Sequence, residues 1–233
     1  MSCGRIPVIR NFTDVRQALQ KLHNDVSNAS FPNLPRDISY HRGLHSMQYY
    51  SSPRVGTTLN WSDAVDANTL YVVPFVVARG LHINAMAVAI ASKLQGDVGS
   101  VVRLGIYDDS VEFSEVSGRS NVFPHHLVHD AGTIPLPNQG NPNTIAADCF
   151  LVPGLYWLAM VHDSTIAAPH FAHHPYGTLF CLGGTQSESN GEWGYYASIG
   201  GTTFPAVFPE NAYGNLLDVD IPAIWVQVGT IVS

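Results

Sequence analysis

The sequence predicts an all-β fold, an antiparallel β-sandwich or barrel preceded by a short helix and an extended arm. After Gly56 the chain consists of short apolar segments, several alternating with a two-residue period, and turn-forming residues separate them. No segment of helical length and period interrupts this series. Consecutive strands without intervening helices form antiparallel sheets rather than a parallel one. The predicted strands are TLYVVPFVVA, INAMAVAIAS, VVRLGIYDD, LVHDAGTIPL, CFLVPGLYWLAMV, TLFCLGG and AIWVQVGTIV.

The only convincing helix lies between residues 12 and 28, where apolar side chains fall on one stripe. The spacings of four, three and four residues match one helix face, and the stripe consists of Val15, Leu19, Leu22 and Val26. The same positions fit the a and d sites of two heptads, but so short a helix needs a surface to pack on. Docking on the chain's own sheets or on a neighbouring protein and self-association as a coil are both open.

Residues 31–53 contain prolines and small polar residues without a sustained period, which predicts an extended arm that contacts other chains. We therefore divide the chain into residues 1–52, an attachment or oligomerisation segment, and residues 53–233, a single β-domain. A length of 233 residues fits one large β-domain with an appendage.

Composition excludes several classes of partner. Only 12% of residues are charged while 45% are hydrophobic, which predicts a large core and a low-charge surface that other proteins cover. With a net charge of −7 and scattered basic residues, no basic stripe is available to bind nucleic acid. The apolar runs are broken by proline, glycine or charge short of a membrane span, so we expect a soluble, unsecreted protein without a membrane partner.

The three cysteines, Cys3, Cys149 and Cys181, leave one thiol unpaired and show no CxxC spacing. Neither a disulfide framework nor a structural zinc site is therefore predicted, and assembly in a reducing environment is the simpler expectation.

Two strands deserve separate predictions. In residues 101–109, Val102, Leu104 and Ile106 alternate with Arg103, Gly105 and Tyr107, so one face is expected to be core. In residues 155–163 both alternating sets are mostly apolar, which predicts a central strand that is covered on both sides or lies at an interface. The polar residues that end these strands are expected to be solvated turn residues, and they are Asp108, Asp109, His162 and Asp163.

Pro153 and Gly154, between two apolar runs, predict a hairpin turn.

Several of these segments together resemble the β-sandwich domains of virion proteins of tailed bacteriophages. The motifs RLGIY and PGLYWLA contribute most, within a match from about residue 57 to residue 184 and in the last strand. The resemblance implies a jelly-roll-like sandwich, assembly into a virion and often a trimer. It implies no catalytic residues, and it covers neither the first fifty residues nor the loop from residue 185 to residue 201.

No motif predicts an enzyme or a cofactor. The sequence contains no GxSxG, HExxH, Walker-type or EF-hand pattern, and a paired-carboxylate site requires a separation that sequence cannot establish. We therefore predict a non-enzymatic protein with no catalytic residue and no cofactor.

Histidine is unusually dense, because seven of the 11 lie between His125 and His174. The main expectation is loop histidines that bond to the backbone or line a subunit interface. Imidazole is also the commonest metal ligand, so a metal on a trimer axis is the alternative, with His170, His173 and His174 as candidates.

Two functions follow as expectations. The first is a virion structural protein, of head-decoration, head-fibre or tail-fibre type, that forms a homotrimer and contacts capsid, portal or tail proteins. The alternative is a receptor-binding module for host-surface glycan. In that module the sugar would bind to exposed aromatic side chains of a polar loop. The expected residues are Trp193, Tyr195 and Tyr196.

Overall fold

A computed structural model of the chain describes residues 49–51, 65–77, 80–90, 99–110, 113–114, 119–120, 123–136, 140–164, 169–174, 194–209, 213–215 and 221–231. All of them belong to the compact unit Gly43–Ser233. The predicted helix with Val15, Leu19, Leu22 and Val26 lies outside these residues, as do Trp193 and the predicted strand TLFCLGG. The division at residue 52 stays a prediction.

Every regular element of the described residues is a β-strand, which confirms the all-β prediction for this part of the chain. Among these residues no helix is long and apolar enough to cross a membrane. The strands are β1 (Tyr49–Ser51), β2 (Thr69–Val77), β3 (Leu81–Ile90), β4 (Val101–Ser110), β5 (Phe113–Ser114), β6 (Arg119–Ser120), β7 (Phe123–Pro135), β8 (Gly140–Leu151), β9 (Gly154–His162), β10 (His173–His174), β11 (Tyr195–Ser198), β12 (Tyr213–Asn215), β13 (Ile221–Pro222) and β14 (Ile224–Ile231).

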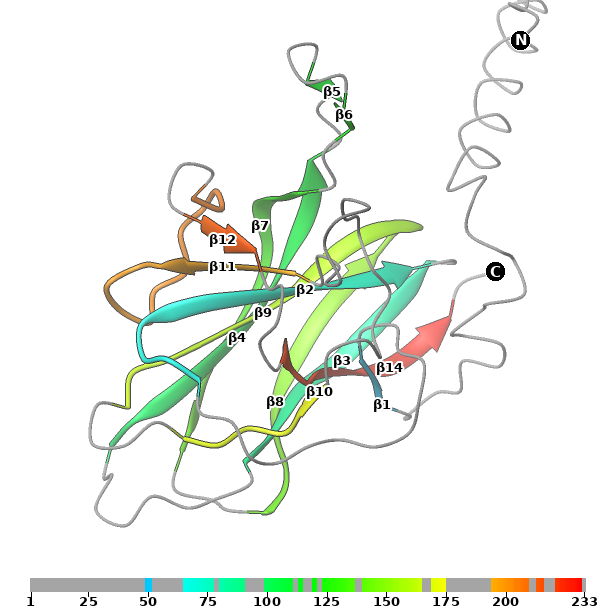
Figure 1. Ribbon diagram of the computed structural model, residues 1–233. Coiled ribbons are helices and arrows are strands. Elements are labelled where there is room, and N and C mark those ends of the chain that lie inside the picture. Colours follow the sequence, from blue (N-terminus) through cyan, green and yellow to red (C-terminus); the bar gives the residue numbers. More distant parts are fainter. Residues whose placement is uncertain are drawn as a thin grey trace, which may run out of the picture. The chain divides into compact units, whose positions relative to one another are not determined.

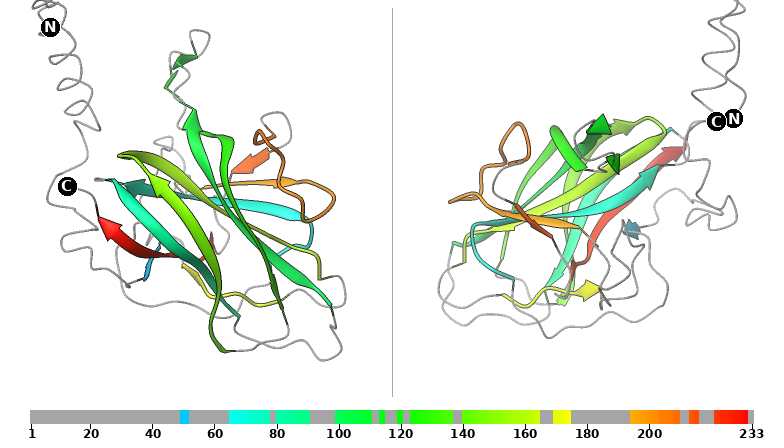
Figure 2. Two further views of the ribbon diagram at one scale, coloured as in Figure 1. Left: turned by 180° about the vertical axis from the view of Figure 1, so that it is seen from behind. Right: turned by 45° about the horizontal axis from the view of Figure 1, so that its top comes forward.

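The long strands form two antiparallel sheets (Figures 1 and 2). One sheet has the order β1-β14-β3-β8, and the other has the order β12-β11-β2-β9-β4-β7. Two short strand pairs, β5 with β6 and β10 with β13, form two-stranded sheets of their own. The segment before β10 is bonded to β3, because the backbone N–H of Ala172 donates to the carbonyl oxygen of Ala89. Strand β1 falls within the segment predicted to be an arm, but it pairs with β14, so this end of the arm belongs to a sheet.

The pairing of the principal strands is nested. Strand β1 pairs with β14, β2 with β9, β3 with β8, and β4 with β7, and each pair is antiparallel. The successive pairs lie alternately in the four-stranded and the six-stranded sheet. The nesting brings together segments that are far apart in sequence, so long-range contacts hold both sheets.

The two sheets share one hydrophobic cluster. Because successive side chains of a strand point to opposite faces, each strand contributes every second residue to it. As predicted, Val102, Leu104 and Ile106 of β4 are buried there. The facing sheet contributes Ile83, Met86, Val88, Ala147, Cys149, Val226 and Val228, among others.

A second cluster covers the other face of the six-stranded sheet. It joins Tyr107 of β4 and Trp157 of β9 to the rings of Phe204 and Phe208, which follow β11 in the chain. Strand β9 contributes alternate residues to both clusters, and this confirms the prediction of a strand covered on both sides.

The prediction of a hairpin at Pro153 and Gly154 is wrong. The chain does turn between β8 and β9, but β8 pairs with β3 whereas β9 pairs with β2 and β4. The turn therefore carries the chain from one sheet to the other. Local sequence predicts that the chain turns, but the choice of neighbour depends on the nested pairing.

Candidate functional site

The candidate site begins with an irregularity in strand β7, which forms one edge of the six-stranded sheet. Tyr107 of β4 pairs with Leu127, and Asp109 pairs with Pro124. Two steps along β4 therefore correspond to three steps along β7, so β7 contains one extra residue here. This is a β-bulge in which His125 and His126 lie opposite Asp108.

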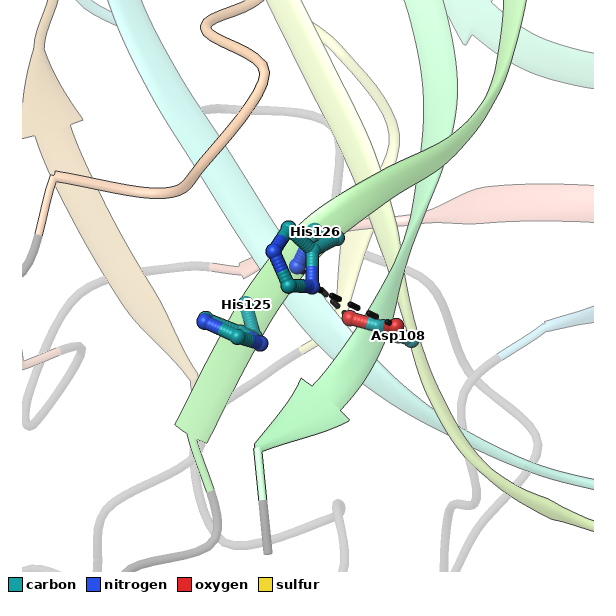
Figure 3. Close-up of side chains that lie close together, drawn as sticks. All are labelled: Asp108, His125 and His126. Carbon is teal, nitrogen blue, oxygen red and sulfur yellow. Dashed lines mark hydrogen bonds and ion pairs between the residues drawn. The ribbon is translucent and has the colours of Figure 1, made fainter. Parts of the chain in front are cut away.

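The bulge brings three side chains together at the end of β4 (Figure 3). Asp108, His125 and His126 each offer one ligand atom, and these atoms lie within 4.8 Å of one another. The backbone N–H of His126 donates a hydrogen bond to Oδ1 of Asp108 over 2.6 Å. Oδ2 of the same carboxylate lies 3.9 Å from Nδ1 of His126. The centroids of the two imidazole rings are 3.7 Å apart.

The group is open to solvent. The side chain of His126 is 55% exposed and that of Asp108 is 37% exposed, while His125 is half-buried. Two imidazole nitrogens and a carboxylate oxygen form a mixed donor set that suits transition metals better than Mg²⁺ or Ca²⁺. Among the described residues, this is the one group of three or more potential protein ligands that converges in this way.

The neighbouring acid, Asp109, has a structural role. Its Oδ1 accepts hydrogen bonds from Nε1 of Trp157 at 3.1 Å and from the backbone N–H of Phe123 at 3.0 Å. Burial raises the pKa of this carboxyl group to about 6, although the two hydrogen bonds act in the opposite direction. The expectation that Asp109 is a solvated turn residue is therefore wrong, because the ends of β4, β7 and β9 meet around it.

The end of β9 also differs from the prediction. His162 is fully buried; the backbone N–H of Ser164 donates to its Nδ1, and its Nε2 lies 2.7 Å from the carbonyl oxygen of Val65. Half-buried Asp163 accepts a hydrogen bond from the backbone N–H of Val101 at 2.8 Å. Both side chains therefore join the strand end to neighbouring segments instead of pointing freely into water.

The three predicted metal-binding histidines lie around strand β10. His170 is half-buried, and His173 is buried, with its Nδ1 3.4 Å from the carbonyl oxygen of Phe171. The side chain of His174 lies outside the described residues. Strand β10 pairs with β13, and none of these contacts tests a role on a trimer axis, which stays a prediction.

The aromatic residues predicted to be exposed have different surroundings. Tyr195 is only 7% exposed and packs against Phe123 and Trp157, with ring centroids 4.9 and 5.3 Å apart, so the prediction of exposure is wrong for it. Tyr196 is 40% exposed and stacks on Tyr71 at a centroid distance of 6.3 Å. The difference arises because these residues lie on strand β11, where successive side chains point to opposite faces.

The sequence pointed separately to the acids that end residues 101–109 and to the dense histidines between His125 and His174. It did not predict their association, because neither the pairing of β4 with β7 nor the position of the bulge can be derived from composition or period. Comparison of the sequence with protein-family models and with curated proteins found no match.

Proposed function

We propose that the chain is a non-enzymatic structural protein of bacteriophage virions, a head-decoration, head-fibre or tail-fibre component that displays a jelly-roll-like β-sandwich. The observation that supports this best is the nested pairing of β1 with β14, β2 with β9, β3 with β8 and β4 with β7 around a shared core. Jelly rolls recur in viral capsid and lectin domains. Fold alone does not determine function, so the sequence resemblance is the second support.

The two motifs that resemble phage virion proteins lie in the interior of the six-stranded sheet. RLGIY lies in β4, and most of PGLYWLA lies in β9, which is paired with β4. The resemblance therefore concerns the strands that build both hydrophobic clusters. This is the part of the chain where a shared sandwich would leave the most similar residues.

Self-association as a homotrimer belongs to the same proposal. Phe150 and Val152, on either side of the end of β8, are each more than half exposed. Contact with another copy of the chain would remove the apolar surface of these two side chains from water, which is favourable. A molar mass from light scattering tests the trimer directly, and a stable monomer at micromolar concentration would contradict it.

The decisive experiment is mass spectrometry of purified particles, followed by a deletion of residues 1–48. The deletion ends before β1 because β1 is part of the four-stranded sheet. We expect the full chain in the particle, and a truncated chain that folds but no longer joins it. Absence of the full chain from particles would overturn the proposal, and full incorporation of the truncated chain would place the attachment surface on the sheets.

Recognition of host-surface glycan is the alternative, favoured by exposed Tyr196 and its stacking on Tyr71. An aromatic face can pack against the apolar side of a sugar ring while nearby polar groups set its orientation. Particles that lack the protein distinguish the two functions. Failure to assemble favours the structural role, whereas intact particles that do not adsorb favour receptor binding.

A further inference from the structure

We propose that Asp108, His125 and His126 form a binding site for a divalent first-row transition metal ion of the Zn²⁺ type. The three ligand atoms lie within 4.8 Å of one another on paired strands. Two neutral imidazole nitrogens with one carboxylate oxygen are a donor set that Zn²⁺ and its neighbours in the series prefer. Mg²⁺ and Ca²⁺, which require oxygen donors, are poorly matched to it.

The β-bulge explains how two consecutive residues can serve one ion. In a regular strand, the side chains of His125 and His126 would point to opposite faces of the sheet. Here both residues lie opposite Asp108, and their rings are in contact, with centroids 3.7 Å apart. Bulges re-aim side chains in this way and are frequent next to functional sites.

The carboxylate is held in place independently of any ion. Oδ1 of Asp108 accepts the backbone N–H of His126, which the bulge removes from the regular ladder. The second oxygen, Oδ2, is then directed toward Nδ1 of His126 at 3.9 Å. One oxygen thus orients the group, and the other can act as a ligand, as is usual for metal-binding carboxylates.

The three ligand atoms lie within 4.8 Å of one another, so closing the site around an ion requires pairs of them to approach by up to about 1.5 Å. Bonds of about 2.0–2.2 Å to a tetrahedral ion place neighbouring donor atoms roughly 3.3 Å apart. The 3.9 Å separation is already near this value, and the exposed side chain of His126 can rotate. Because the side chains of His126 and Asp108 are open to solvent, water or a donor from another protein can complete the shell.

The chain offers a matched control in His82 and Asp148 on strands β3 and β8. Nε2 of His82 lies 2.6 Å from Oδ1 of Asp148, and its Nδ1 lies 3.0 Å from Oδ1 of Asn84. This is a second histidine–carboxylate pair at a strand surface, but both ring nitrogens already have partners. We therefore expect His82→Gln to leave metal binding unchanged.

The test is calorimetric titration of the chelator-treated full-length protein with ZnCl₂. We expect a binding step of one ion per chain in the wild type and in His82→Gln. In His125→Gln/His126→Gln that step should weaken at least about 100-fold, because loss of supporting groups alone costs 10- to 100-fold. Single His126→Gln, at an exposed position, should lose most of the affinity while retaining the wild-type circular dichroism spectrum.

Other histidines can bind zinc weakly, so the difference between variants is the measurement that decides. Titration with CoCl₂ adds a direct signal, since visible absorption bands report a low-coordinate ion with nitrogen ligands. The bands should appear in the wild type and be absent from the folded double variant. Identical titrations of the two proteins, or no binding step in the wild type, would overturn the proposal.

Discussion

Gly105, in the middle of strand β4, is predicted to be a position where a single methyl group destabilises the fold. It alternates with Leu104 and Ile106 and therefore faces the outer cluster of the six-stranded sheet. A Cβ atom at this position would lie 2.6 Å from Cε2 of Phe204 and 2.8 Å from the carbonyl oxygen of His129. Both distances are shorter than van der Waals contact, so Gly105→Ala requires movement of the ring and of strand β7.

The neighbours of Gly105 have little freedom to move. Phe204 packs edge-on against Tyr107 at a centroid distance of 6.1 Å, and the guanidinium carbon of Arg103 lies 5.9 Å from the centre of its ring. The oxygen of His129 belongs to the backbone of β7, opposite Ile106. Overpacking of this kind costs about 1–3 kcal/mol. Replacing a strand glycine by alanine recovers about 0.5–1 kcal/mol of chain entropy, so we expect a net loss of about 0.5–2 kcal/mol.

Urea unfolding, followed by tryptophan fluorescence and by circular dichroism, measures this loss. Gly201→Ala is the matched control, because a Cβ atom there would meet nothing within 4 Å and its φ is not positive. We expect the control to be as stable as the wild type or slightly more stable. If Gly105→Ala unfolds at the same urea concentration as Gly201→Ala, the close approach of Phe204 and β7 to Gly105 is refuted.

Three further substitutions test the structure in metal-free buffer. The carboxyl group of Asp109 has a pKa of about 6 in the fold and 3.8 in the reference state, so its contribution to stability is complete below about pH 4 and is lost as the pH rises through 6. In unfolding experiments at several pH values, Asp109→Asn should therefore gain stability relative to the wild type between pH 4 and 7. A stability difference that does not change with pH would contradict this. Tyr107→Phe removes the 2.7 Å hydrogen bond to the carbonyl oxygen of Pro205 and should lower the free energy of urea unfolding by about 1–2 kcal/mol. An unchanged free energy of unfolding would mean that this bond does not stabilise the fold. The side chain of Leu158 is fully buried between the sheets, so Leu158→Ala should lower the free energy of unfolding by about 2–5 kcal/mol. A loss of about 1 kcal/mol lowers the melting temperature by roughly 2–3 °C. A variant that melts within this range of the wild type would be incompatible with a shared core.

The candidate metal site and the two sheets differ in how far the sequence could predict them. The alternation of Val102, Leu104 and Ile106 identified the buried face of β4, and the apolar character of residues 155–161 identified a strand covered on both sides. These predictions depend only on the two-residue period of a strand and on the burial of apolar side chains, which are local properties. They hold whichever strands become neighbours.

The association of Asp108 with His125 and His126 depends instead on register. It requires β4 to pair with β7 and one extra residue of β7 to be accommodated at that point. The burial of His162 and of Tyr195 likewise depends on which segments cover the strand ends. Sequence alone therefore determined that the chain folds into strands and which faces of the long strands β4 and β9 are apolar, because those follow from local geometry. Only the tertiary structure decided the strand neighbours, the bulge and the surroundings of the polar side chains, because these result from packing between segments far apart in the chain.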